Sequence, residues 1–204
     1  MGELADRLER LTVRETSPDG QIAATRDRNQ VTLRFHEGAY RSYTESALAG
    51  QLGDLARSVR AGCQRGYYEV IGDVTGQPVS AGEVERELDG RERRFYEAQR
   101  ALRVETSSVN GWITVETEGL DQWRVRIRDG ALRALSEEQF ISEGVAALGR
   151  LLTAYHDRDR ELRDEFFDLK LPEGSKLPDE NGLPGGTEPA AGSEEGGRDG
   201  RFWY

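Results

Sequence analysis

Two stretches of this chain share one pattern: SPDGQIAATRDRNQVTLRFHEGAY at residues 17–40 and SVNGWITVETEGLDQWRVRIRDGAL at residues 108–132. Each begins with an Asp-Gly or Asn-Gly pair, ending at Gly20 or Gly111, of the kind that joins the strands of a tight hairpin. A strand-like run follows, and then a second run in which apolar and polar residues alternate. The pattern predicts the same strand-turn-strand unit twice in one chain.

The two stretches align at nearly constant offsets, which indicates an internal duplication. The turn serine, the turn glycine and the first isoleucine align at an offset of 91 residues: Ser17 with Ser108, Gly20 with Gly111, and Ile22 with Ile113. The alternating runs and the glycines after them align at an offset of 92: Arg34 with Arg126, Gly38 with Gly130, and Arg41 with Arg133. One inserted residue in the 118–121 loop accounts for the change.

Helical patterns flank the strands in both copies. Apolar residues at helical spacing precede the first copy: Leu4, Leu8 and Leu11. A capping box precedes the second copy, Ser80 with Glu83, and its helix carries Val84, Leu88, Phe95 and Ala98. Thr44 and Ser136 are good N-cap residues for a long helix after the strands. We therefore expect an α+β protein of two α-β-β-β-α repeats, packed together as an intrachain pseudo-dimer.

These patterns divide the chain into four segments: repeat 1 at 1–71, a linker at 72–82, repeat 2 at 83–170 and a tail at 171–204. The tail is acidic and rich in Gly and Pro, and its lack of apolar periodicity predicts disorder. It ends in three aromatic residues: Phe202, Trp203 and Tyr204. We interpret them as a motif that docks on a partner protein; alternatively, they dock on the body of the chain itself or have no role.

Composition narrows the function classes. The chain of 204 residues carries a net charge of -10, and its single cysteine and two histidines, Cys63, His36 and His156, offer too few ligands for a structural zinc site. No nucleophile-base motif or phosphate-binding glycine loop is present, so we expect no enzyme activity, cofactor or metal. Cys63 is predicted to be a small buried residue, and both histidines are predicted to be exposed. Without an apolar run long enough for a membrane span, and with arginine far in excess of lysine, the chain resembles a bacterial cytoplasmic protein.

An arginine ladder is the strongest electrostatic feature. Arg124, Arg126 and Arg128 alternate with Trp123, Val125 and Ile127, so a strand would place the arginines on one face and the apolar residues on the other. Arg34 is the single arginine at the corresponding positions of the first copy. These four arginines are candidate phosphate contacts for DNA. Alternatively, the ladder pairs with neighbouring acids such as Glu116 and Glu118.

The repeated unit resembles the YbaB/EbfC family of nucleoid-associated proteins, whose pattern is a helix, a glycine turn between strands and a helix that begins after an acidic cap. The resemblance covers about residues 1–70 and 84–168. It implies an α-β-β-β-α fold, pairing of two units and DNA binding with limited sequence preference. This chain differs from the family in that its copies are fused and its charge is acidic. The alternative is a protein-interaction module that kept the fold without DNA binding, as in type VII secretion accessory proteins.

Overall fold

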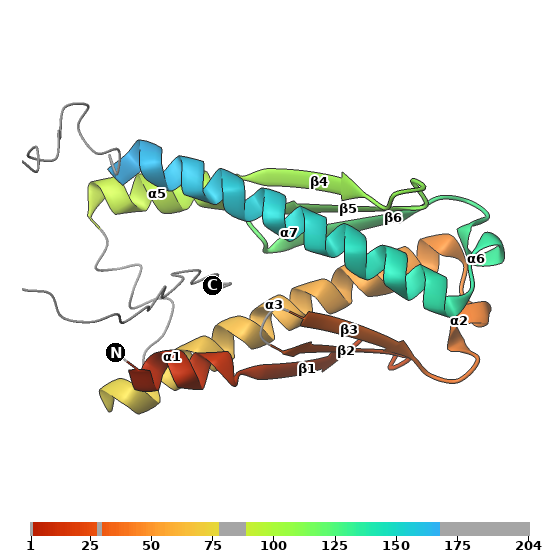
Figure 1. The fold of residues 1–204 in the computed structure, drawn as a ribbon, viewed down its shortest axis with the longest axis horizontal. Helices are drawn as coiled ribbons and strands as arrows, with labels where there is room; N and C mark the ends of the chain where they lie inside the picture. The colour runs from red at the N-terminus through yellow and green to blue at the C-terminus, as the bar shows by residue number, and fades with distance from the viewer. Residues whose placement is uncertain (1, 28–29, 78–88, 168–204) are drawn as a thin grey trace, which may run out of the picture.

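A computed structural model describes residues 2–27, 30–77 and 89–167 (Figure 1). Several predictions fall outside these ranges: the disordered tail at 171–204 with its aromatic end at Phe202, Trp203 and Tyr204, the linker from residue 78 onward, and the capping box of Ser80 and Glu83 with Val84 and Leu88 of its helix. Over the described residues the chain is an α+β protein with two three-stranded antiparallel sheets, as predicted.

In the first half, a helix, one sheet and two further helices follow in order: α1 (Gly2–Glu9), β1 (Thr12–Thr16), β2 (Ile22–Asp27), β3 (Gln30–Phe35), α2 (Ala39–Ser42) and α3 (Glu45–Thr75). The second half repeats this order: α5 (Gly90–Arg100), β4 (Arg103–Ser107), β5 (Ile113–Glu118), β6 (Gln122–Ile127), α6 (Ala131–Ala134) and α7 (Glu137–Phe167). The sheet orders are β1-β2-β3 and β4-β5-β6.

α5 begins at Gly90, where Asp89 and Glu92 form a capping box. Two details of the helices differ from the sequence prediction. Residues 72–75, assigned to a linker, form the last turn of α3, which stops at Gly76 because this glycine adopts the left-handed conformation of a helix C-cap. The four-residue helices α2 and α6 were not predicted. Each follows a glycine with positive φ, which turns the chain out of the preceding strand.

The hairpin turns of the two halves share a glycine of positive φ and a buried serine. Gly20 and Gly111 have φ of 73° and 69°, as their turn sequences predict. Ser17 and Ser108 are both 4% exposed, and their hydroxyl groups accept hydrogen bonds from the backbone N–H of Ile22 and Ile113, respectively. The buried serine therefore satisfies a strand donor that would otherwise lack a partner.

The one-residue insertion expected from the alignment lies in the second hairpin of the second half. β2 ends at Asp27 and β3 begins at Gln30, whereas β5 ends at Glu118 and β6 begins at Gln122. The β5–β6 connection is therefore one residue longer, and the offset between equivalent residues changes from 91 to 92 at this point. The extra residue lies in the Gly119–Asp121 segment, as expected from the alignment.

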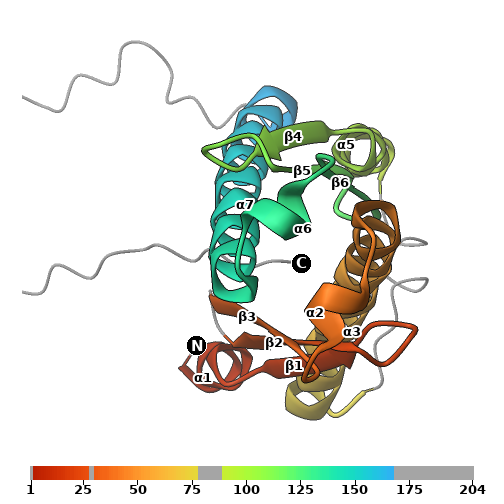
Figure 2. The same cartoon turned by 90° about the vertical axis from the view of Figure 1, so that its right-hand side faces the viewer.

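The two sheets and the two long helices surround a common interior. In Figure 2 the sheets lie on opposite sides and α3 and α7 form the two remaining sides. α3 packs on β1 of its own sheet and on β6 of the other sheet, and α7 packs on β4 and β5 as well as on β3. Each long helix therefore contacts both halves.

Hydrogen bonds join the halves at the end where α2 and α6 meet (Figure 1). The Tyr40 hydroxyl donates to the carbonyl oxygen of Leu135 at 3.2 Å, and Arg41 donates to the carbonyl oxygen of Leu132 at 2.5 Å. The Gly130 N–H donates to a Glu45 carboxylate oxygen at 3.0 Å. Because these bonds tie backbone of one half to side chains of the other, they fix how the halves meet.

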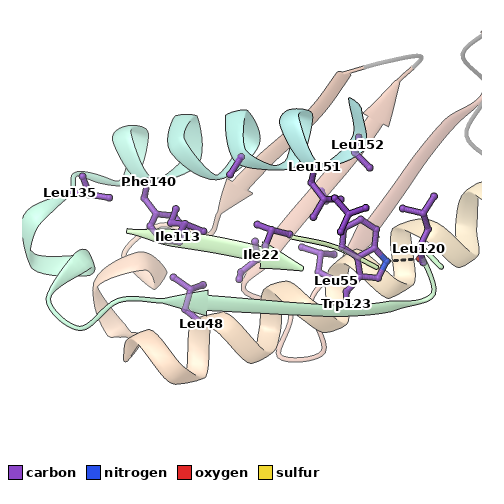
Figure 3. Packing of buried hydrophobic residues seen from close by; sticks show 14 of the residues in the cluster. Ile22, Leu48, Leu55, Ile113, Leu120, Trp123, Leu135, Phe140, Leu151 and Leu152 are labelled. Carbon is purple, nitrogen blue, oxygen red and sulfur yellow. Dashed lines mark hydrogen bonds between the residues drawn. The ribbon is translucent and has the colours of Figure 1, made fainter. Parts of the chain in front are cut away.

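One apolar core runs through both halves. Ile22, Leu48, Ile113, Phe140 and Leu151 are at most 1% exposed, and Figure 3 shows them converging between the sheets and the long helices. Each half alone would leave its share of this cluster uncovered. Burial of apolar area contributes roughly 25 cal/mol per Å², so association of the halves supplies much of the stability.

Candidate functional site

The arginine ladder lies on the outer face of β6, as its alternation predicts. Trp123 is 9% exposed and belongs to the core with Val125 and Ile127 beside it, whereas Arg124 and Arg126 are exposed on the opposite face. The ladder therefore faces away from the interior. What surrounds it on that face decides whether its charge is available to a ligand.

A buried carboxylate lies beneath the ladder. Glu116, on the adjacent strand β5, is 6% exposed and directly opposite Arg124 in the sheet register. Its oxygens lie 3.1 Å from Arg126 Nη1 and 3.7 Å from Arg124 Nη1, and Arg103 on β4 also binds it. The hydrogen bond from Arg103 holds the pKa of Glu116 below its usual range, although burial acts in the opposite direction. Glu116 is therefore ionised at neutral pH and shared by three arginines.

A second acid completes the pairing. Glu105 on β4 lies 2.5 Å from Arg126 Nη2, and both side chains are half exposed. The face of this sheet thus carries Arg103, Arg124 and Arg126 against Glu105, Glu116 and Glu118, and its formal charge is balanced. The predicted pairing of the ladder with Glu116 is present in the structure.

Arg128 lies apart from this cluster. It follows the last residue of β6, and its guanidinium carbon lies 4.4 Å from the centre of the Trp112 ring. This distance is that of a cation–π contact. The guanidinium therefore covers an indole ring at the end of the strand instead of extending the row of Arg124 and Arg126.

Arg34 does not join the ladder. It is exposed on β3, between Leu33 and Phe35, which pack against the core. Its side chain therefore lies on the outer face of the first sheet, and the outer faces of the two sheets point in opposite directions (Figure 2). The structure does not bring the four arginines into one patch.

The outer face of the first sheet has a different character. Its register brings together nine mostly neutral side chains, five of which are Thr or Ala: Thr12, Arg14, Thr16, Ala23, Thr25, Asp27, Gln30, Thr32 and Arg34. All are exposed except Thr25, which is half-buried. We call this surface the threonine face. β1 and β3 are the edge strands of the sheet that carries it.

A cavity of about 140 Å³ lies in the interior, between the sheets and the long helices. Its walls are apolar and come from both halves, among them Leu33, Leu55, Val125, Phe140 and Leu148. Two arginines of the first half, Arg26 and Arg60, line it as well.

Arg60 is the least expected residue of this lining. It lies on α3, and its side chain is 15% exposed. Its Nε lies 3.7 Å from an oxygen of Asp121, but Nε and Nη1 are buried and form no hydrogen bond with the described residues. Arg26 is satisfied differently, because its Nη1 donates to the Cys63 sulfur at 2.7 Å.

Sequence reasoning missed this interior site, although the repeat contained a signal for it. At the offset of 92, Arg60 aligns with Leu152, which is 7% exposed in the core. The alignment therefore places a charged residue on the apolar side of α3, where the second half has a buried leucine. Cys63 is 3% exposed, as predicted. His36 is exposed as predicted, whereas His156 is half-buried.

Within residues 2–27, 30–77 and 89–167, no group of three or more His, Cys, Asp and Glu side chains converges as metal ligands would. Over the same residues, none of the helices combines the length and the apolar character that crossing a membrane requires.

The chain matches no family model, no curated protein and no solved structure.

Proposed function

We propose that this chain is a fused pair of YbaB/EbfC-like repeats, arranged as an intrachain pseudo-dimer, that acts as a non-enzymatic protein-interaction module and not as a DNA-binding protein. The identical order of elements in the two halves supports the duplication. So do the matching hairpin turns and the single-residue change of offset in the β5–β6 connection. The pseudo-dimer is supported by the way each long helix packs on strands of both sheets.

The pairing of the ladder's arginines with acids is the observation that favours protein interaction over DNA binding. DNA binding depends on arginine and lysine side chains that replace the counterions of phosphates. Arg124 and Arg126 are already bound by Glu116, and Arg126 also by Glu105. A phosphate would have to displace these carboxylates, on a chain whose net charge of -10 repels it.

The threonine face favours a protein partner. The cores of protein interfaces are depleted in charged residues, and this face carries three charged residues among its nine positions, Arg14, Asp27 and Arg34, against six among the nine of the other sheet's outer face. Threonine is stiff at χ1, so ordering it at an interface costs little side-chain entropy. The edge strands β1 and β3 add backbone groups that a partner strand can pair with. We place such an encounter in the cytoplasm, with the aromatic end at Phe202, Trp203 and Tyr204 as a second docking element.

A salt titration against a duplex of about 30 base pairs, read by fluorescence anisotropy, separates the two functions. We expect no saturable binding by the wild-type chain at 25 mM salt. The double variant Glu105→Gln/Glu116→Gln should begin to bind, with a log–log salt slope of about 2 to 3 phosphates, because it releases the ladder. A matched control, Glu97→Gln/Glu161→Gln, removes two exposed charges elsewhere and should not bind.

Wild-type binding whose salt slope flattens when Arg124, Arg126 and Arg128 become glutamine would instead establish the DNA-binding function.

The partner surface is tested by photo-crosslinking in cells. A photoreactive residue in place of Gln30, on the threonine face, should give a discrete adduct. The same residue in place of Gln122, the equivalent position of the second sheet, should not. Equal labelling from both sites would contradict the assignment of the threonine face.

A further inference from the structure

The interior cavity has the size and lining of a small-molecule site. Protein interiors are packed like organic crystals and contain few voids larger than a water molecule. A cavity of about 140 Å³ is close to the roughly 150 Å³ of an engineered apolar cavity that accepts benzene. The side chains of this cavity are contributed by both sheets and both long helices, so a bound molecule would contact the two halves at once.

Arg60 gives this apolar space one polar end. Its Nε and Nη1 are buried and form no hydrogen bond with the described residues, although a buried guanidinium stays charged. Asp121 approaches to 3.7 Å from Nε but is itself mostly exposed, with a side chain that is 60% accessible. Unsatisfied donors of a buried charge are costly, and an anion that accepts from them removes that cost.

The other polar groups near Arg60 do not supply that anion. Arg26 is a second cation and donates to Cys63. Tyr155 donates to the carbonyl oxygen of Gln99, and burial raises the pKa of Tyr155 to about 12, so it stays neutral. The lining of the cavity therefore carries two cations and no anion, and it is apolar along the rest.

We propose that the cavity binds a small amphipathic carboxylate, with its hydrocarbon tail between the sheets and its carboxylate on Arg60. A planar carboxylate matches the fork of a guanidinium and can accept from two of its N–H groups. The apolar part that fits is about the size of benzene, which corresponds to a short carboxylic acid of roughly six to eight carbons. This inference goes beyond the proposed partner binding and does not depend on it.

The alignment of the two halves supplies the variants that test the site. Arg60→Leu introduces the residue that the second half has at the equivalent position, Leu152, and removes the cation. Ala56→Leu introduces the counterpart Leu148 and fills the cavity while Arg60 stays in place. Arg65→Gln is the matched control, because Arg65 is an exposed arginine of the same helix that pairs with Glu15 outside the cavity.

The probe is sodium octanoate, measured by isothermal titration calorimetry against the full chain, with 1-octanol as its neutral analogue. We expect saturable binding of one octanoate, weakened at least about tenfold for octanol and for Arg60→Leu. Ala56→Leu should bind at least about tenfold more weakly as well. Arg65→Gln should bind like the wild type, and Asp121→Asn more tightly, because it removes the competing carboxylate.

Absence of saturable octanoate binding at millimolar concentration would overturn the proposal. Equal affinities for octanoate and octanol would overturn the role of Arg60, and so would undiminished binding by Arg60→Leu. If Arg60→Leu does not fold, as judged by its thermal unfolding, the octanol comparison and the Ala56→Leu variant still decide the outcome. An equal loss in Arg65→Gln would show that octanoate only associates with surface charge.

Discussion

The outer faces of the two sheets occupy equivalent positions and carry opposite chemistry. Thr25 in the first sheet corresponds to Glu116 in the second, Thr32 to Arg124, and Arg14 to Glu105. The first face is therefore nearly neutral. The second carries a network of ion pairs, which we call the charge lattice: Arg103, Arg124 and Arg126 with Glu105 and Glu116. A shared backbone register thus supports two different surfaces, and acids on the neighbouring strands neutralise the arginine row of the second one.

The halves also differ in one loop. Gly119 and Leu120 both have φ of 62°, and Leu120 is the only residue other than glycine with positive φ among the described residues. Leu120 is 2% exposed, and its carbonyl oxygen accepts from the Trp123 indole at 2.6 Å (Figure 3). The longer connection of the second half therefore adds a buried side chain and a partner for the core tryptophan.

The largest effect is expected at this loop. A Cβ added at Gly119 would lie 2.6 Å from the carbonyl oxygen of Arg100, and its φ of 62° disfavours any side chain. We expect Gly119→Ala to lower the free energy of unfolding by about 2–4 kcal/mol, from left-handed strain and overpacking. Urea unfolding measures the change. In Gly111→Ala, which has open space at the Cβ position, only the strain of about 1 kcal/mol should remain.

An equal loss at Gly111 and Gly119 would contradict this prediction. It would mean that the positive φ alone, and not the contact with Arg100, sets the requirement for glycine.

The charge lattice should respond more strongly than the threonine face. Glu116→Gln removes the anion that Arg103, Arg124 and Arg126 share, and we expect it to cost about 2 kcal/mol, the range for hydrogen bonds to charged groups. Thr25→Val at the equivalent position keeps the shape and should change stability by less than about 0.5 kcal/mol. Chemical denaturation of both variants measures the difference.

Equal costs at Glu116 and Thr25 would show that the charge lattice adds nothing beyond strand packing.

The strands and turns were predictable because they depend on local signals. Asp-Gly and Asn-Gly turns, alternating residues such as Trp123 and Arg124, and N-caps such as Thr44 act within a few positions of the chain. The pairing of Glu116 with Arg124 was also within reach, since adjacent strands bring such residues opposite each other.

The interior site depends on contacts that periodicity does not encode. Arg60 approaches Asp121 of the other half, so only the packing of α3 on β6 brings the two together. Arg103 reaches Glu116 across the sheet from a strand that the ladder pattern does not include. The halves meet at the short helices α2 and α6, where Arg41 donates to Leu132, a residue far away in the sequence.

The pH dependence of stability gives a smaller and more selective test of the lattice. Because the folded state lowers the pKa of Glu116, its contribution is fully present above the unfolded value of about 4.3 and is lost as the pH falls through the folded value. We expect the stability difference between the wild type and Glu116→Gln to be constant above about pH 5 and to shrink below about pH 4. Denaturation midpoints at several pH values measure it.

A difference that stays constant down to pH 2 would mean that Glu116 contributes through packing and not through its charge.

The smallest effect concerns the exposed pair of Arg126 and Glu105, which lie 2.5 Å apart with both side chains half exposed. Exposed ion pairs contribute about 0.2–1 kcal/mol in double-mutant cycles, because solvent screens them and ordering two long side chains costs entropy. A cycle of Arg126→Gln and Glu105→Gln should give a coupling of this size, and 1 M salt should reduce it. The same cycle with Arg126 and the buried Glu116 should give a larger coupling that salt reduces less. If the two couplings are equal and equally salt-dependent, Glu116 is no more shielded than Glu105. The ladder would then be open to phosphate, and the difference between the two sheet faces would no longer argue against DNA binding.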